Sequence, residues 1–482
     1  MKSFFLLISF LSFCLGSRSL FAKNTEDNTP LDSVTQNRPM LFNYYVVKDI
    51  QIEGNQITHP SIILRELTFK AGDQIPLDIA DQILERSRQN IFNTSLFNFV
   101  EIAKEIENGN EIRIKIKVFE RWYTWPSPVF ELADRNFNEW WSRGRSFSRT
   151  NYGMYLVQEN FRGRDETLTI GVRAGFSEKY SLSYEIPYLS KRKKGGLILG
   201  FSFGRNHEIP YAVDEANHLL FYKNPDKYIL ESVASSLRYT YRAGIYNTNI
   251  ASLEFNQESV ADTVTHLNTD FYVKGMTRNR YISLGYYFAH DQRDFKNYPL
   301  VGNFFDIGFR QSGLGIEKNQ IQFLSLYGSV KRFWQLNQNW FYAAGLSGRF
   351  VKASTLPYLY QSALGYGTDY VRGYEYQVFK GYHFMLLKTN LKYRLISERV
   401  YKLGWPKLEK FNTIPYALYM NFIFDAGYLM QRPSDRLQFK NILPGYGIGL
   451  DYVTYYSMVL RMEYTFNKFG KSDLYLHFVI PI

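Results

Sequence analysis

The stretch Ser457-Met458-Val459-Leu460-Arg461-Met462-Glu463-Tyr464-Thr465-Phe466-Asn467, close to the end of the chain, decides the fold. Successive side chains of a β-strand point to opposite faces. In this stretch one face is apolar, with Met458, Leu460, Met462, Tyr464 and Phe466, and the other carries Ser457, Arg461, Glu463 and Thr465. A charge at the bilayer midplane costs about 2–4 kcal/mol. The pattern therefore predicts a strand with one face toward lipid and the other toward a polar interior.

The same alternation recurs in segments of about ten residues from Trp125 to Ile482, separated by turns rich in Gly, Asn, Asp and Lys. About sixteen strands are predicted near 125–134, 150–159, 165–176, 178–187, 194–206, 228–242, 247–258, 279–291, 302–312, 320–334, 339–353, 383–396, 414–428, 443–454, 455–467 and 472–482. An even count fits a bacterial barrel, and short connections alternate with long ones at 207–227, 259–278 and 354–382. Aromatic residues make up 18% of the 482 residues, although hydrophobic residues reach only 45%, as a barrel with a wet interior requires.

Residues 1–22 begin with Lys2, continue through an apolar run and end in small residues, which predicts a signal peptide cleaved after Ala22. A flexible leader is expected at 23–42. No later run reaches the roughly 18 apolar residues of a membrane helix, so an exported membrane protein of this composition must cross as a closed barrel. The only cysteine, Cys14, lies inside the signal peptide, where lipidation is the alternative reading. The formal charge of +12 suits anionic lipid headgroups or an acidic substrate, whereas nucleic acid does not suit an exported chain.

Residues 43–121 have a different pattern from the barrel that we expect at 122–482. A strand at 46–52 precedes helical stretches near 59–68 and 77–91, and two strands follow at 97–102 and 111–118. This β-α-α-β-β order predicts one small α+β domain in which two helices cover one face of a sheet.

Four short motifs in this domain carry a resemblance. They are Glu53-Gly54-Asn55, Arg65-Glu66-Leu67, Gly72-Asp73 and Val118-Phe119-Glu120-Arg121. In this order they resemble a POTRA domain, the periplasmic module of the BamA-like and two-partner-secretion superfamily of outer-membrane barrels. The resemblance implies that an open sheet edge binds extended clients by β-augmentation. The alternative is a small spacer domain without a client.

The long connection 354–382 contains Val371-Arg372-Gly373-Tyr374. The motif and its place after the eleventh strand resemble the tip of the sixth extracellular loop of that superfamily, which folds into the lumen. The resemblance also implies a barrel-wall partner on the thirteenth strand, where Phe424, Asp425 and Gly427 match, and alternation places Asp425 inside. We predict a charge-assisted contact between Arg372 and Asp425; the alternative is that Arg372 lies in a solvated loop. Relatives often have an acidic residue on the twelfth strand, where this chain has Asn390 and Lys392.

The resemblance implies a protein of the Gram-negative outer membrane that assembles outer-membrane proteins or translocates polypeptides. Its expected partners are unfolded outer-membrane or secreted polypeptides, outer-membrane lipids, and periplasmic chaperones or accessory lipoproteins. A single POTRA unit favours a specialised or accessory role. The alternative function is a passive pore or structural barrel without a protein client.

Catalysis is not predicted. The seven histidines, His59, His207, His218, His266, His290, His383 and His477, are scattered singly. Gly200-Phe201-Ser202-Phe203-Gly204 has the Gly-x-Ser-x-Gly spacing, but it lies inside the strand predicted at 194–206 and not at a strand-to-helix turn. No His-Glu-x-x-His or Gly-rich phosphate motif is present in the sequence. We therefore expect no catalytic residue, no metal site and no cofactor.

Overall fold

A computed structural model of the chain describes residues 43–132, 140–141, 147–189, 194–315, 321–402, 404, 413–430, 442–454 and 458–479. The predicted signal peptide and leader lie outside these residues. Across the described ranges, no helix is both long enough and apolar enough to cross a membrane.

The N-terminal domain contains one four-stranded sheet and two α-helices. Its elements are β1 (Tyr44–Glu53), α2 (Pro60–Arg65), β2 (Gln74–Pro76), the 3-10 turn η1 (Leu77–Ile79), α3 (Ala80–Phe92), β3 (Phe97–Asn108) and β4 (Glu111–Glu120). The strand order is β2-β1-β4-β3, with β1 and β4 parallel. The predicted order of strands and helices is present, but the three-residue strand β2 was not predicted because it is too short to show alternation.

Strand β4 shows why this domain folds as it does. Its Ile112, Ile114, Ile116 and Val118 are at most 1% exposed, whereas the alternating residues are polar or lie at the surface. The buried row packs with Ile91 and other residues of the helices in one apolar core. Pro60 occupies the first turn of α2, where its missing N–H leaves no intrahelical bond unmade. Strand β3 remains at one edge of the sheet.

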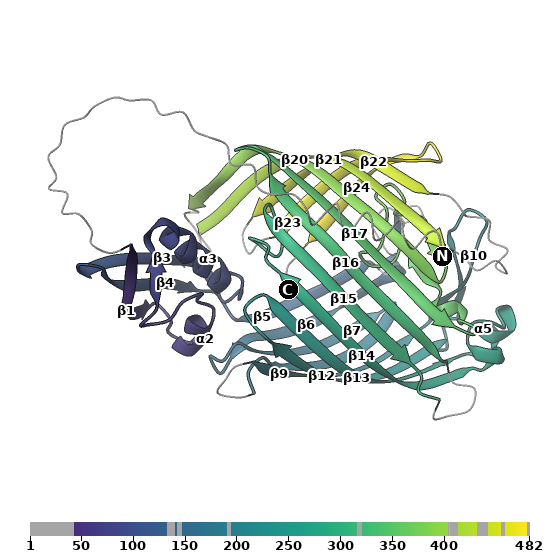
Figure 1. Cartoon of the computed structure of the whole chain (residues 1–482). Coiled ribbons are helices and arrows are strands. Elements are labelled where there is room, and N and C mark those ends of the chain that lie inside the picture. Colours follow the sequence, from purple (N-terminus) through teal and green to yellow (C-terminus); the bar gives the residue numbers. More distant parts are fainter. Residues whose placement is uncertain are drawn as a thin grey trace. The chain divides into compact units, whose positions relative to one another are not determined.

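The remainder of the chain forms a sixteen-stranded antiparallel sheet, whose neighbouring strands lie side by side in Figure 1. The strands are β5 (Thr124–Leu132), β6 (Thr150–Phe161), β7 (Glu166–Gly175), β8 (Ser177–Ile186), β9 (Gly195–Asn206), β12 (Leu230–Arg242), β13 (Asn247–Val260), β14 (Arg278–Asp291), β15 (Gly302–Ser312), β16 (Phe323–Gln335), β17 (Trp340–Ala353), β20 (His383–Lys402), β21 (Thr413–Met430), β22 (Leu443–Thr454), β23 (Met458–Asn467) and β24 (Ser472–Val479). The predicted fold class and strand number are confirmed.

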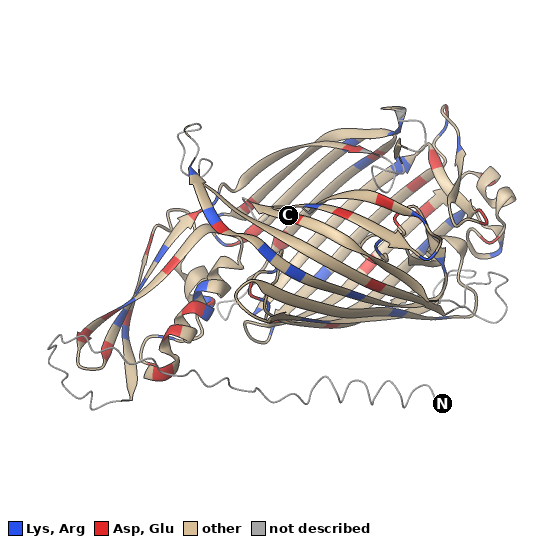
Figure 2. Ribbon diagram, turned by 90° about the horizontal axis from the view of Figure 1, so that it is seen from above, with Lys and Arg blue, Asp and Glu red and all other residues tan. Residues whose placement is uncertain are grey.

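The two faces of the sheet differ as alternation predicted. On β23, Met462 and Tyr464 are each 42% exposed on the outer face, whereas Glu463 between them is 1% exposed. Charged residues recur along the strands, as the blue and red segments of Figure 2 show, and ion pairs join some of them across neighbouring strands. For example, Glu254 contacts Arg238 at 3.2 Å and Arg310 at 3.0 Å.

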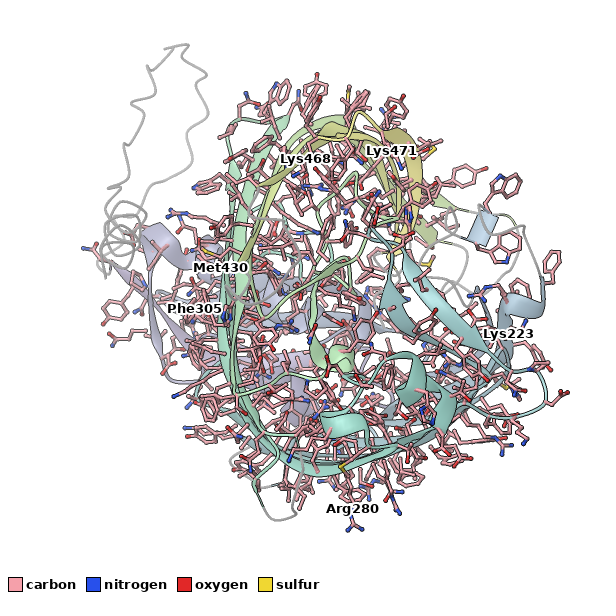
Figure 3. The ribbon with its side chains drawn as sticks, turned by 90° about the vertical axis from the view of Figure 1, so that its right-hand side faces the viewer. Lys223, Arg280, Phe305, Met430, Lys468 and Lys471 are labelled. Atoms are coloured by element: carbon pink, nitrogen blue, oxygen red, sulfur yellow. The ribbon has the colours of Figure 1, made fainter. Side chains whose placement is uncertain are left out.

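The three long connections contain secondary structure that the sequence pattern did not predict. The first forms a hairpin of β10 (Glu208–Val213) and β11 (Leu219–Lys223), which pair with each other and not with the barrel sheet. The second contains α5 (Asp262–Leu267) and η3 (Val273–Gly275), and the third contains η4 (Tyr358–Tyr360), β18 (Ser362–Leu364) and β19 (Phe379–Lys380). Figure 3 looks onto this end of the barrel, where Lys223 ends β11 and Lys468 and Lys471 lie between β23 and β24.

Two features of the sheet are relevant to function. The strand order runs from β24 to β5, and no ladder joins these two end strands within the ranges that the structure describes. The second feature is the length of β20 and β21, which have 20 and 18 residues. Crossing a bilayer takes about 9–11 tilted residues, so both strands extend beyond the barrel wall. The sequence prediction ended β20 at residue 396, six residues too early, because the charged residues that follow break the alternation.

Candidate functional site

The connection between β17 and β20, here called loop 6 (residues 354–382), lies against the inner wall. Val371 and Tyr374 are each 1% exposed and Arg372 is 4% exposed. Val371 and Tyr374 belong to an apolar cluster that loop 6 shares with three wall strands; its members are Ala363, Leu364, Val371, Tyr374, Phe379, Phe384, Leu386, Leu429 and Leu443. Burial of this apolar surface holds the loop tip in the lumen.

Arg372 and Asp425 form a bidentate ion pair. The guanidinium donates from Nε to Oδ2 at 2.8 Å and from Nη2 to Oδ1 at 2.6 Å, and the backbone N–H of Arg372 donates to Oδ2 at 3.1 Å. The Asp425 side chain is fully buried. A buried carboxylate that receives three hydrogen bonds, two of them from a planar cation, is strongly oriented.

Three further wall groups complete the surroundings of Arg372. Its Nη1 donates to Asn390 Oδ1 at 2.7 Å and lies 3.5 Å from Glu463 Oε1, and its Nη2 donates to the backbone oxygen of Thr389 at 3.1 Å. Asn390 therefore lies at the position on the twelfth strand where relatives often have an acidic residue, and its amide oxygen accepts a hydrogen bond from Arg372. Glu463 on β23 supplies a second negative charge beside Arg372. Glu463 was not predicted as a partner of Arg372, although the alternation of its strand already placed it on the inner face.

The residues after Arg372 are held through backbone groups. Gly373 has φ +94°, a conformation that favours glycine, and its carbonyl accepts from Asn467 Nδ2 at 2.7 Å. The Tyr374 hydroxyl donates to the Pro444 carbonyl at 2.9 Å and accepts from the Lys468 backbone N–H at 3.1 Å. The tip motif is therefore fixed to β22, β23 and the turn that follows β23.

Two wall glycines make room for the tip. A Cβ at Gly427 would lie 2.6 Å from Val371 Cγ2, and a Cβ at Gly445 would lie 1.9 Å from the carbonyl oxygen of Arg372. Phe424 is 48% exposed on the outer face, so of the three predicted wall residues it does not face the loop. Its backbone carbonyl accepts from Thr389 Oγ1 at 2.7 Å, a contact within the wall itself.

A second ion pair lies beside the first on the same wall. Arg461 donates from Nε to Asp451 Oδ1 at 2.8 Å and from Nη2 to Oδ2 at 3.2 Å. The Tyr298 hydroxyl, from the connection between β14 and β15, also donates to Asp451 at 2.8 Å. Each of the two arginines, Arg372 and Arg461, therefore has an aspartate of its own.

The N-terminal domain contacts the adjacent rim of the barrel through polar groups. Arg242 donates to both carboxylate oxygens of Glu66, at 2.9 and 3.2 Å, and Arg86 Nε donates to the Tyr246 hydroxyl at 2.9 Å. Close by, burial and the neighbouring charge of Glu66 raise the pKa of Asp165 to about 7, although a 3.1 Å hydrogen bond from the Tyr188 hydroxyl opposes the shift. We call this set of contacts the rim joint.

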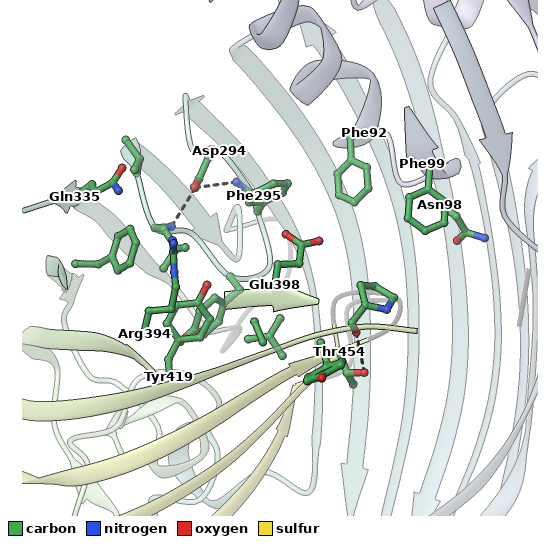
Figure 4. A pocket seen from close by; sticks show the side chains of 18 of the residues that line it. Phe92, Asn98, Phe99, Asp294, Phe295, Gln335, Arg394, Glu398, Tyr419 and Thr454 are labelled. Carbon is green, nitrogen blue, oxygen red and sulfur yellow. Dashed lines mark hydrogen bonds between the residues drawn. The ribbon is translucent and has the colours of Figure 1, made fainter. Parts of the chain in front are cut away.

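A groove lies between edge strand β3 and the barrel (Figure 4). Phe92, Asn98, Phe99 and Arg121 line it from the N-terminal domain. From the barrel it is lined by Asp294, Phe295, Tyr298, Leu300, Val301, Gln335, Phe341, Arg394, Glu398, Pro415, Tyr416, Ala417, Tyr419, Val453 and Thr454. Most of these side chains are aromatic or aliphatic, so the groove suits an extended chain with apolar residues.

These features define a class of protein: a membrane-type β-barrel with a loop fixed inside its lumen and a small α+β domain at one rim. The model of the Omp85 superfamily domain matches residues 160–478, and the POTRA model, described as a surface antigen variable number repeat, matches residues 45–121. The chain belongs to the Omp85 superfamily.

The chain is also similar to solved structures. CdiB from Escherichia coli is 12% identical with a TM-score of 0.52, and the match covers 90% of this chain and 75% of that one. BamA from Haemophilus ducreyi lacking POTRA domains 1–3 is 14% identical with a TM-score of 0.49, covering 90% of this chain and 83% of that one. CdiB from Acinetobacter baumannii is 14% identical with a TM-score of 0.47, covering 90% and 73%. No curated protein matches the chain.

Family membership places the barrel in the outer membrane of a Gram-negative bacterium and the POTRA domain in the periplasm. The rim that holds the POTRA domain is then the periplasmic rim, and loop 6 enters the lumen from the outer side. The general function that follows is insertion of proteins into the outer membrane or translocation of polypeptides across it.

Proposed function

We propose that the protein is a specialised or accessory outer-membrane insertase or polypeptide transporter that binds unfolded clients along β3 and passes them to the barrel through the groove of Figure 4. The observation that carries the proposal is the position of β3. This twelve-residue strand is at the edge of its sheet, pairs only with β4 among the described residues, and contributes Asn98 and Phe99 to the groove. An open edge binds extended peptides through backbone hydrogen bonds with little sequence specificity.

Two further features support this proposal. The end strands β24 and β5 lack a ladder between them in the described ranges, which gives a place where a client strand can pair. The POTRA match at residues 45–121 supports binding of a client on the periplasmic side of the barrel. Outer-membrane lipids and periplasmic chaperones or accessory lipoproteins are the proposed additional partners.

The proposed mechanism involves no covalent chemistry. It uses strand pairing, apolar contact in the groove and the barrel wall. A phospholipase activity of the pure protein that is lost on substitution of one histidine would contradict it.

Site-specific crosslinking tests client binding. A photoreactive amino acid at Asn98, on β3 in the groove, is expected to form adducts with unfolded outer-membrane or secreted polypeptides in cells. The matched control is Glu85, an exposed residue of α3 in the same domain. Equal adducts at both positions, or none at Asn98, would contradict binding along β3.

Depletion followed by a census of outer-membrane and secreted proteins tests the role. Loss of a few proteins is expected for a specialised factor, whereas a broad loss would show a general one. An unchanged census, together with a large steady conductance that persists after deletion of residues 43–120, would support the passive pore instead.

A further inference from the structure

Three metal-ligand side chains meet beside the tip of loop 6. They are Glu375 from the loop, Glu463 from β23 and His477 from β24, and one ligand atom of each lies within 4.8 Å of the other two. His477 Nε2 is 3.5 Å from Glu463 Oε2 and 4.0 Å from Glu375 Oε1. The sequence could not show this cluster because the three residues come from separate elements at irregular spacing.

The distances suit an ion better than direct contact. Hydrogen bonds to a ring nitrogen are about 2.7–3.2 Å long, and both nitrogen–oxygen distances here exceed that range. A zinc ion bound at about 2.0–2.2 Å separates its ligand atoms by roughly 3.3–3.5 Å in tetrahedral geometry. The observed 3.5 and 4.0 Å require only a small contraction around an ion.

The other contacts of Glu463 orient its carboxylate toward His477. Its Oε1 lies 3.5 Å from Arg372 Nη1 and 3.7 Å from Arg461 Nε. Its Oε2 faces His477, and neither this oxygen nor His477 Nε2 has a hydrogen-bond partner among the described residues. Because Glu463 is 1% exposed, a carboxylate oxygen without a hydrogen-bond partner destabilises the folded protein unless a ligand binds to it.

Glu375 is oriented in a similar way. Its Oε2 accepts from the backbone N–H of Gly373 at 2.8 Å, and its Oε1 points to His477. Hydrogen bonds to the outer atoms of ligands are the usual means of positioning them for a metal.

The balance of charge also favours a cation. Arg372 pairs with Asp425 and Arg461 pairs with Asp451, so each nearby arginine is matched by its own aspartate. Glu375 and Glu463 then add two carboxyl groups, beyond the two aspartates that neutralise the arginines, in a largely buried space. The other nearby cation, Lys388, lies over the Tyr370 ring at 4.0 Å and donates to the Thr368 carbonyl.

We propose that Glu375, Glu463 and His477 form a binding site for a divalent transition metal such as Zn²⁺, which joins the tip of loop 6 to the hairpin of β23 and β24. One imidazole and two carboxylates are ordinary zinc ligands, and a water completes the tetrahedron. The 22% exposure of the His477 side chain leaves a path for the ion. This site is independent of the proposed function.

The test uses the purified full-length protein in detergent after removal of metals. Titration with Zn²⁺ in competition with a chromophoric chelator is expected to show one site. The His477→Gln and Glu375→Gln variants should bind at least about 100-fold more weakly, since loss of a ligand exceeds the 10–100-fold effect of its supporting groups. The matched control is His290→Gln, a strand histidine whose Nδ1 contacts Asn247 at 2.7 Å, and it should bind like the wild type.

Cobalt provides a second measurement that does not depend on affinity alone. Co²⁺ bound to the wild type is expected to give the visible absorption of a tetrahedral site, and His477→Gln should lose it while its folded barrel still migrates as the compact form on unheated gels. Absence of Zn²⁺ binding by the wild type, or equal binding by wild type and His477→Gln, would overturn the proposal and leave protons shared among the three side chains as the explanation.

Discussion

The barrel holds loop 6 and the POTRA domain by arginine–carboxylate pairs that differ in their access to water. In the loop, the Arg372 and Asp425 side chains are 5% and 0% exposed; at the rim joint, those of Arg242 and Glu66 are 28% and 3% exposed. A buried charge that loses its partner has no solvent to replace it, whereas water partly replaces the partner of an exposed one. The position of loop 6 is therefore coupled to the stability of the barrel more strongly than the position of the POTRA domain.

The largest effect is expected from Arg372→Glu. The substitution places a second carboxylate against Asp425 and Glu463, so the loop tip should leave the wall and the barrel should lose about 3–5 kcal/mol or more of stability. Urea unfolding, followed by the gel shift between folded and heated protein, measures the loss, and trypsin cleavage within loop 6 reports its release. Arg280→Glu, at an exposed position labelled in Figure 3, makes the same charge change and should have little effect. An ordered loop and normal activity in Arg372→Glu would show that the pair does not hold the loop.

A smaller effect on the same contact is expected from Gly445→Ala. The new Cβ would lie 1.9 Å from the Arg372 carbonyl oxygen, so either β22 or the loop must move, at a cost of about 1–3 kcal/mol. The same gel-shift assay measures this change. Gly244→Ala is the control, because nothing lies within 4 Å of a Cβ there. Equal stability of the two variants would mean that the wall adapts without strain.

At the rim joint, Glu66→Gln should cost only about 1 kcal/mol, since Arg242 retains solvent and one amide oxygen. We expect faster proteolysis between the POTRA domain and the barrel, with an unchanged urea midpoint for the barrel. Glu85→Gln, which removes an exposed 2.7 Å pair with Arg88, serves as the control. If the urea midpoint of the barrel in Glu66→Gln were as low as in Arg372→Glu, the rim joint would be as important for barrel stability as the pair of Arg372 and Asp425.

The pH dependence of the rim joint should be the weakest effect, because Asp165 is only half-buried and the remaining solvent contact screens the shift in its pKa. Its folded pKa of about 7 is above the ordinary value of 3.8, so the folded state keeps a proton that the unfolded chain has released. Stability from this residue is therefore present below the ordinary pKa and falls as pH rises toward about 7. Asp165→Asn should reduce the dependence of the free energy of unfolding on pH, measured by urea titration at several pH values. The control variant Asp78→Asn, at an exposed position, should not. A pH dependence unchanged by Asp165→Asn would assign it to another group.

The comparison also shows what the sequence could predict. Alternation such as that of Met462, Glu463 and Tyr464 reports which face a side chain occupies, so the number of strands and their inner and outer faces were predicted correctly. The Val371-Arg372-Gly373-Tyr374 motif indicated which residue of loop 6 would meet Asp425, and the two are in contact.

Contacts that depend on strand register could not be predicted in the same way. Glu463 and His477 are inward by parity, but only the pairing of Arg461 with His477 across β23 and β24 places them together. Asn390 was noted as a departure from the usual acidic residue, and its role as an acceptor for Arg372 required three-dimensional structure. Similarly, β10 and β11 have only six and five residues, too few for alternation to reveal a short hairpin within a long connection.

The lengths of β20 and β21 have a consequence for solubility in the periplasm. Val400, Tyr401 and Lys402 pair with Pro415, Ile414 and Thr413, and no third strand continues this ladder among the described residues. Exposed strand edges promote aggregation unless charges, prolines or bulges interrupt them. This ribbon has all three: Glu398, Arg399 and Lys402 are charged, Pro415 lacks an N–H, and the register shifts on both sides of Ile396. The ribbon therefore extends beyond the membrane while resisting edge-to-edge pairing with other copies of the protein.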